Sequence, residues 1–180
     1  MNNETIAICA QLGAGSTEVA EIVGKRLGFE VYNTDKLLRR IAIDSGLSFE
    51  QLASKSVSGE VEIDDILFSY ALDILNKGKV IFEGRSSILI FLAPITLKVF
   101  LTAPDYVRAK HVADVRKISY ENAVNEVRVS DQDRENLARK MCKINWQDPQ
   151  LYDLVINTGG LEYEDVAELI VNAFDMKKKR

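Results

Sequence analysis

The fold is decided by residues 6–17, Ile6-Ala7-Ile8-Cys9-Ala10-Gln11-Leu12-Gly13-Ala14-Gly15-Ser16-Thr17. The apolar run 6–10 predicts a strand buried on both faces, and the apolar positions from Val19 to Leu27 recur at helical spacing. A glycine-rich turn between a strand and a helix places backbone N–H groups and the positive end of the helix around a phosphate group. The stretch therefore predicts a phosphate-binding loop in an α/β fold.

The loop departs from the standard motif G-x-x-x-x-G-K-[ST] at two positions. Gly15 matches the second glycine and Thr17 matches the hydroxyl that binds magnesium, whereas Ala10 stands at the first glycine and Ser16 at the lysine. Serine donates a hydrogen bond but supplies no charge, and a missing cation in a water-poor site costs transition-state stabilisation. Two alternatives stay open: another cation reaches the site, or the site binds nucleotide without efficient transfer.

The composition is that of a soluble globular protein. The chain has 180 residues, 47% of them hydrophobic and 28% charged, and its formal net charge is −4. We expect one domain covering residues 1–180, in the cytoplasm, without membrane or nucleic-acid partners, because nucleic-acid-binding domains usually carry a basic excess. The two cysteines, Cys9 and Cys142, are expected to be free and reduced, since their spacing matches no disulfide framework or zinc site.

Strand and helix patterns alternate along the chain. The expected strands are Thr5–Ala10, Glu30–Tyr32, Lys79–Glu83, Leu97–Thr102 and Leu154–Asn157. The expected helices are Thr17–Leu27, Asp35–Asp44, Ser48–Ala53, Ile63–Asn76, Pro104–Val115, Tyr120–Arg128, Asp131–Ile144 and Glu162–Phe174. This alternation predicts a parallel sheet of about five strands with helices on both faces, and ligands at the carboxyl ends of the strands.

Five short stretches together resemble the cytidylate-kinase-like family of the P-loop nucleoside-monophosphate kinases. They are the glycine-rich turn with its helix, Gly84-Arg85 after a strand, the run 99–104 (Val-Phe-Leu-Thr-Ala-Pro), the run 146–149 (Trp-Gln-Asp-Pro) and the run 152–158 (Tyr-Asp-Leu-Val-Ile-Asn-Thr). The resemblance extends from Ile6 to Ile170. It implies a three-layer P-loop fold with a substrate-binding insertion at about 35–76 and a helical lid at about 108–146. From the residues alone, these two regions could equally be peripheral helical pairs.

The resemblance also implies an ATP-dependent phosphotransferase that uses Mg²⁺ and acts on a small nucleotide such as CMP. On this interpretation ATP is bound by the loop residues Gln11, Gly13, Ala14, Gly15, Ser16 and Thr17, with Thr17 on the magnesium side. Arg85 would bind the acceptor phosphate, and Arg134 with Asp131 would act on the transferring group. Asn33 and Asp35 would contact the substrate, although Asp35 could instead cap the following helix.

Other side chains have simpler interpretations. Glu83 ends a central strand and could reach magnesium through water, whereas His111 is expected at the surface and Trp146 as a packing anchor. Ser86 stands where the resembling family carries an aspartate. Because the lysine is missing, two further functions remain open: a nucleotide- or anion-binding pseudokinase with little or no transfer activity, and a kinase for another small molecule.

Overall fold

The computed structural model describes residues 4–46, 48, 50–51 and 63–179. Within these residues, five strands form one parallel sheet in the order β2-β3-β1-β4-β5. The strands are β1 (Thr5–Ala10), β2 (Glu30–Tyr32), β3 (Val80–Glu83), β4 (Leu97–Thr102) and β5 (Leu154–Asn157). The predicted parallel sheet is confirmed. β3 begins one residue later than expected, because Lys79 has a left-handed backbone with φ of 53°.

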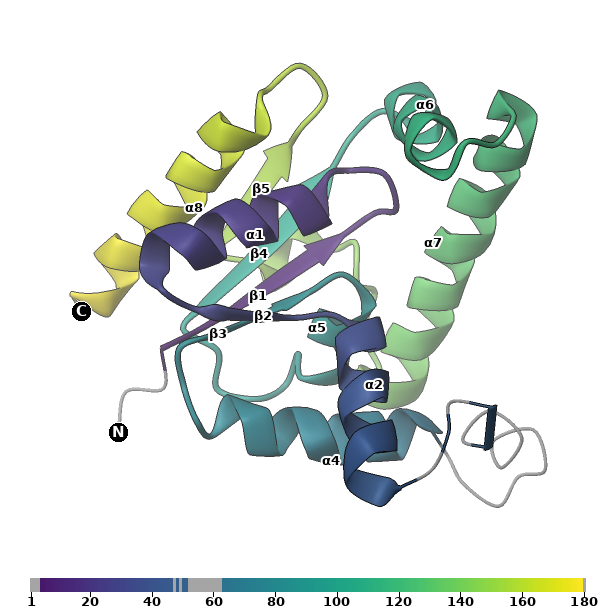
Figure 1. The fold of residues 1–180 in the computed structure, drawn as a ribbon. Helices are drawn as coiled ribbons and strands as arrows, with labels where there is room; N and C mark the ends of the chain where they lie inside the picture. Colours follow the sequence, from purple (N-terminus) through teal and green to yellow (C-terminus); the bar gives the residue numbers. More distant parts are fainter. Residues whose placement is uncertain (1–3, 47, 49, 52–62, 180) are drawn as a thin grey trace.

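Helices cover both faces of the sheet (Figure 1). One face carries α1 (Ser16–Leu27) and α8 (Tyr163–Lys178), and the other carries α4 (Ile63–Leu75), α5 (Arg85–Leu89) and α7 (Tyr120–Cys142), with α2 (Thr34–Ser45) packed on α4. β1 supplies both cores, because successive side chains of a strand point to opposite faces. Ile6 and Ile8 pack toward α1 and α8, whereas Ala7 and Cys9 pack toward the other layer.

The helix ends follow the expected capping chemistry. Gly28 ends α1 with φ of 68°, a left-handed conformation that glycine adopts without steric cost. Ser119 accepts a hydrogen bond from the backbone N–H of Asn122 and caps α7. Ser48 and Gln51 exchange two hydrogen bonds in a capping box, as predicted; the rest of the predicted helix Ser48–Ala53 lies largely outside the described residues.

Two helix predictions were wrong. The expected helices Tyr120–Arg128 and Asp131–Ile144 are one unbroken helix, α7, because the intervening residues Val129 and Ser130 include neither glycine nor proline to interrupt it. The short helix α5 was not predicted, since five residues cannot display a helical period. α6 (Asp105–Arg116) packs against the first half of α7, and this pair stands beyond the end of the sheet (Figure 1).

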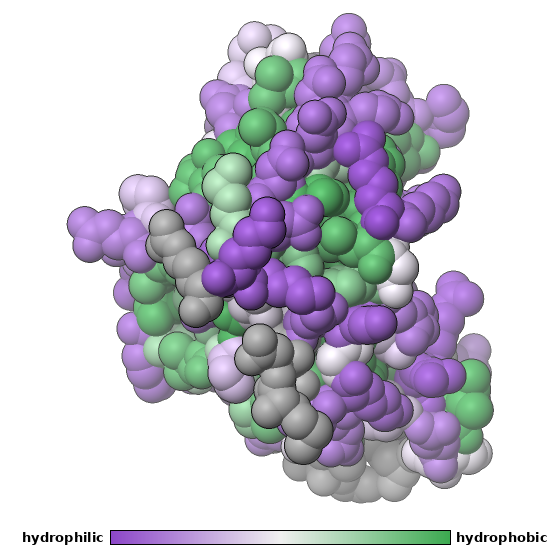
Figure 2. Space-filling model, turned by 90° about the vertical axis from the view of Figure 1, so that its left-hand side faces the viewer, coloured by the Kyte–Doolittle hydropathy of each residue, from purple (hydrophilic) through white to green (hydrophobic). Residues whose placement is uncertain are grey.

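The outer surface mixes polar and apolar side chains. On the side that faces left in Figure 1, charged and polar groups are interspersed with apolar patches (Figure 2). α8 exposes Leu169 and Met176 on its outer face. Among the described residues, no helix combines the length and the apolar character needed to cross a membrane.

Candidate active site

The glycine-rich turn joins β1 to α1 at the carboxyl edge of the sheet. Gly13 and Gly15 have φ of 84° and 80°, which side chains other than glycine rarely adopt. A Cβ atom on Gly13 would lie 2.5 Å from the backbone oxygen of Arg108, and one on Gly15 would lie 2.3 Å from the ring of Tyr163. Both glycines are therefore required by their conformation and by the elements packed against the turn.

Two other residues of the predicted ATP-binding set, Gln11 and Ala14, stabilise the turn through hydrogen bonds. Gln11 accepts hydrogen bonds from the Ala14 N–H and, through its side chain, from the Thr102 hydroxyl. Ala14 is buried, and its carbonyl accepts from the Thr158 hydroxyl at 3.1 Å. The side chains of Gln11 and Ala14 thus support the loop, which leaves their backbone as the part able to contact a ligand.

Ser16 and Thr17 begin α1, and both donate to the carboxylate of Glu83. The Ser16 hydroxyl lies 3.0 Å from one carboxylate oxygen and the Thr17 hydroxyl 3.3 Å from the other. Glu83 ends β3 and is 5% exposed, and this burial raises the pKa of its carboxyl above the usual range, against the lowering effect of the two hydroxyls. The residue at the lysine position therefore contacts an acid of the central sheet.

A cleft of about 380 Å³ opens between the glycine turn, the ends of β2 and β3, and α6. Its wall brings together residues that are distant in sequence, including Arg85, Arg134, Thr34, Asn33 and Asp35. This is the edge at which parallel α/β sheets bind ligands. The sequence-predicted residues Gly13, Gly15, Ser16 and Thr17 line the same cleft.

Arg134 is a largely buried cation in this cleft. Its guanidinium donates to the carbonyl and the hydroxyl of Ser130, one turn earlier in α7, and its Nε has no hydrogen-bond partner among the described residues. Burial lowers the pKa of Arg134, the carboxylates of Asp131 and Glu83 raise it, and the positive charge of Arg85 lowers it. Two guanidiniums that repel each other across a cleft define a site that favours an anion.

Arg85 follows the left-handed Gly84 and begins α5. Its side chain is 45% exposed and pairs with Asp64 of α4 at 3.6 Å. Ser86 points elsewhere: it is fully buried, and its hydroxyl donates to the carbonyls of Tyr32 and Glu83. Ser86 therefore ties the ends of β2 and β3 together instead of facing a ligand.

Asn33 caps α2, so the alternative role considered for Asp35, that of the helix cap, is taken by Asn33. The Asn33 side-chain oxygen accepts from the Lys36 backbone N–H at 2.8 Å. Asp35 lies in the first turn of the helix, where a negative charge is favourable. Both side chains line the cleft, together with Thr34, whose buried hydroxyl has no partner among the described residues.

Arg108 is not among the site residues predicted from the sequence, because charged residues on helices usually lie on solvated faces. It is 2% exposed and contacts Asp131 at 2.9 Å, Asp105 at 2.6 Å and the carbonyl of Leu12 at 3.2 Å. Asp131 is thus paired with Arg108 and does not line the glycine-loop cleft. No local sequence signal distinguishes Arg108 from the exposed arginines of α7.

His111 was expected at the surface, but it lies at the mouth of the cleft. Its Nδ1 is 3.3 Å from the Tyr163 hydroxyl and its Nε2 is 3.4 Å from a Glu18 oxygen. The group joins α6, α8 and α1 around Gly15. Trp146 is buried as predicted, with its ring edge-on to Phe100.

The oxygens around Thr17 suit a hard cation. Mg²⁺ is usually held by one or two protein oxygens together with substrate phosphates and water. The Thr17 hydroxyl and the Glu83 carboxylate provide such a pair, and a bound cation would favour the charged form of a carboxyl whose burial opposes ionisation. These two residues fit the role of magnesium ligands, directly or through water.

Solved structures with low sequence identity share this fold. A protein from Eubacterium ventriosum superposes with a TM-score of 0.71 at 19% identity, covering 96% of this chain and 98% of that one. Shikimate kinase from Acinetobacter baumannii superposes with a TM-score of 0.64 at 15% identity, covering 99% and 97%. At such identities the likeness establishes the fold, which is that of the P-loop NTPases.

The sequence comparisons define the family. Residues 5–160 match the model of the cytidylate kinase-like family, and the chain belongs to it. The cytidylate kinase of Archaeoglobus fulgidus is 29% identical over 174 residues, 96% of each chain, and that of Methanothrix thermoacetophila is 30% identical over 154 residues, 86% of this chain and 88% of the relative. The family and the fold support a nucleoside-monophosphate kinase-like function.

Proposed function

We propose that this protein transfers the γ-phosphoryl group of ATP to a small nucleotide such as CMP, with Mg²⁺. The observation that carries the proposal is the pair Arg85 and Arg134 in the cleft of the glycine turn. Two donors in that cleft, the Nε of Arg134 and the hydroxyl of Thr34, have no acceptor among the described residues, and phosphate oxygens would supply one.

Each element of the site then has a role in positioning or charge neutralisation. The backbone of residues 13–17 would hold the ATP phosphates at the start of α1, and Arg85 would bind the acceptor phosphate. Thr17 and Glu83 would hold the magnesium ion, which would supply positive charge to neutralise the phosphates when bound. Asn33 and Asp35, on the other wall of the cleft, are available to contact the acceptor.

Arg134 is our candidate for the missing positive charge. It is largely buried and close enough to Glu83 for the two charges to affect each other, and the Glu83 carboxylate accepts a hydrogen bond from the Ser16 hydroxyl. A guanidinium held here would face the phosphates from α7 instead of from the loop itself. Asp131 would act indirectly, by holding Arg108 beneath the loop.

The acceptor is tested by titrating ATP–Mg²⁺, then CMP, dCMP and UMP, into the purified protein by calorimetry, with ADP release followed on the same samples. The proposal expects ATP binding and ADP release that depends on one of these acceptors. If ATP binds but none of them releases ADP above the background hydrolysis rate, the transfer reaction is refuted for this substrate class.

A second candidate is a nucleotide-binding protein without transfer, and the observation that favours it is Ser16. Its hydroxyl is already bonded to Glu83, so the lysine position contributes no charge to the site. Ser16→Lys separates the candidates further. If the loop has simply lost its lysine, this variant should bind ATP more tightly; an unchanged or weaker affinity would mean that the loop is adapted to another ligand.

A further inference from the structure

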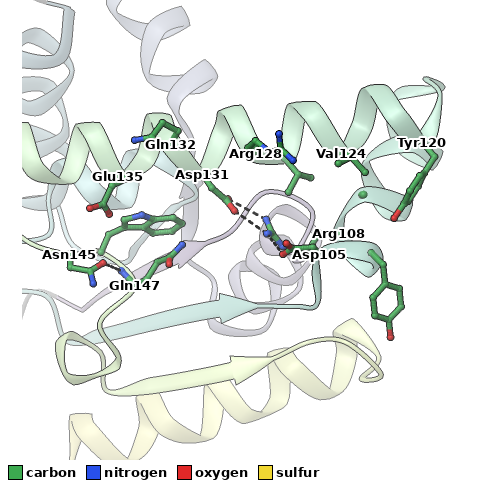
Figure 3. A pocket seen from close by; sticks show the side chains of 14 residues that line it. Asp105, Arg108, Tyr120, Val124, Arg128, Asp131, Gln132, Glu135, Asn145 and Gln147 are labelled. Atoms are coloured by element: carbon green, nitrogen blue, oxygen red, sulfur yellow. Dashed lines mark hydrogen bonds and ion pairs between the residues drawn. The ribbon is translucent and has the colours of Figure 1, made fainter.

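A second cavity, of about 930 Å³, lies between α6, α7 and the segment 145–147. Figure 3 shows Arg108 of α6 and Asp131 of α7 pointing toward each other within it, with Gln132 and Glu135 along α7 and Asn145 and Gln147 on the segment that follows. It shares no lining residue with the glycine-loop cleft. We propose that this cavity binds a neutral, planar heteroaromatic molecule with hydrogen-bond acceptors, the chemistry of a nucleoside base.

Two buried donors in the cavity wall have no partner. Arg108 is 2% exposed and Trp146 is 1% exposed, and neither the Nε of Arg108 nor the Nε1 of Trp146 finds an acceptor among the described residues. Buried donors are nearly always satisfied in folded proteins. Because guanidinium and indole N–H groups can only donate, the molecule that completes this wall must offer acceptors.

The rest of the wall favours a flat ring with polar edges. Tyr106 is 68% exposed and Tyr120 is 50% exposed, so both rings are available at the cavity for stacking. Gln132, Asn145 and Gln147 add amide groups, which donate and accept hydrogen bonds. Stacking faces combined with amides match a nucleobase better than a lipid or a simple anion.

Charge argues for a neutral ligand. Asp105 and Asp131 are both paired with Arg108, and Glu135 is paired with Arg139. Among the charged lining residues, this leaves Arg128, which lies exposed on α7, as the one without an ion pair in the described structure. The cavity thus offers little unpaired charge to a polyphosphate or a polyamine.

A molecule bound in the cavity should affect the phosphate loop, because Arg108 contacts both the cavity and the loop. Its side chain donates to the Leu12 carbonyl, and its backbone lies against Gly13. A molecule that bonds Arg108 would therefore alter the support of the loop. By thermodynamic linkage, the bound molecule would change the affinity for ATP by the same factor as ATP changes the affinity for that molecule.

The test is calorimetric titration of the full chain with adenosine, cytidine and uridine, which carry no phosphate and make the result independent of any transfer activity. Trp146 is the single tryptophan of the chain, so its fluorescence reports on the same cavity. We expect saturable binding of at least one nucleoside. Tyr120→Ala should weaken nucleoside binding about fivefold or more, because removing an aromatic ring on which a base stacks lowers the affinity by about this factor.

Trp146→Phe tests the unpartnered donor, since it keeps an aromatic ring but removes the N–H; calorimetry should show weaker binding by a similar factor. Arg85→Ala is the control in the other cleft and should leave the dissociation constant within about twofold. The proposal is overturned if no nucleoside binds saturably. It is also overturned if Tyr120→Ala and Trp146→Phe both leave the binding unchanged, because the nucleoside then occupies a site other than this cavity.

Discussion

Replacing Arg108 by methionine keeps an unbranched apolar side chain and removes the buried guanidinium. Losing one partner of a buried ion pair costs about 3–5 kcal/mol. Asp131 is 20% exposed, so we take the lower end, about 3 kcal/mol. The contact with Asp105 adds little, because that side chain is 89% exposed. The carbonyl of Leu12 loses its donor as well, which should loosen the glycine turn.

Urea and thermal denaturation measure the Arg108→Met effect directly. For a chain of this size, a loss of about 3 kcal/mol lowers the melting temperature by roughly 6–12 °C. Arg139→Met is the matched control: its ion pair with Glu135 is on the surface, with the arginine 70% exposed, and should change stability by less than about 0.5 kcal/mol. A loss below about 1 kcal/mol for Arg108→Met, or equal losses for both variants, would refute the role of Arg108 as a buried tie between α6, α7 and the loop.

Three further predictions concern the glycine turn and the central sheet. Burial raises the pKa of Glu83, so the folded protein holds this proton to higher pH than the unfolded chain and loses stability as pH rises above the ordinary value. Glu83→Gln should therefore become more stable to urea than the wild type as pH rises above 4.5, while its Mg²⁺-dependent ATP binding weakens. A stability difference that does not change with pH would contradict this. Gly13→Ala should lower the free energy of unfolding by ~2 kcal/mol or more, because its Cβ would collide with the Arg108 backbone. Gly28→Ala is the control and should cost ~1 kcal/mol, since a Cβ there meets no atom within 4 Å. Equal losses in urea denaturation would mean that the Arg108 backbone moves to make room for the Cβ. Burial raises the pKa of Cys9 to about 11, so maleimide at pH 8 should label this thiol only when urea unfolds the protein. The labelled cysteine is identified by peptide mass. Rapid labelling of Cys9 in the native protein would mean that β1 opens to solvent.

The sheet could be predicted because its buried strands are short apolar runs bounded by turn residues. β1, β2, β4 and β5 have the predicted bounds, and β3 differs by one residue. The glycine turn followed from the same pattern. Helix boundaries were harder: nothing between the two predicted halves of α7 stops a helix, and α5 is too short to show a period.

The site could be predicted only in part. Residues next to strand ends, such as Arg85 and Asn33, are brought to one edge by the parallel topology, so sequence position was informative. Arg108 and His111 come from α6, whose burial depends on how it packs on α7 and over the loop. The local sequence around a charged helical residue does not show whether its side chain faces solvent or a buried carboxylate. Only the tertiary structure therefore distinguishes Arg108 from the exposed arginines of α7.

The central claim is that Arg134, a largely buried arginine of α7, supplies the positive charge that the loop lacks. The most direct measurement is the rate of ADP release with ATP–Mg²⁺ and the preferred acceptor for wild type, Arg134→Ala and Arg139→Ala, with ATP affinity measured by calorimetry on each. We predict that Arg134→Ala lowers kcat about 100-fold or more and ATP affinity far less, while Arg139→Ala matches the wild type. Equal losses of kcat and ATP affinity in Arg134→Ala, or an unchanged kcat, would contradict the account.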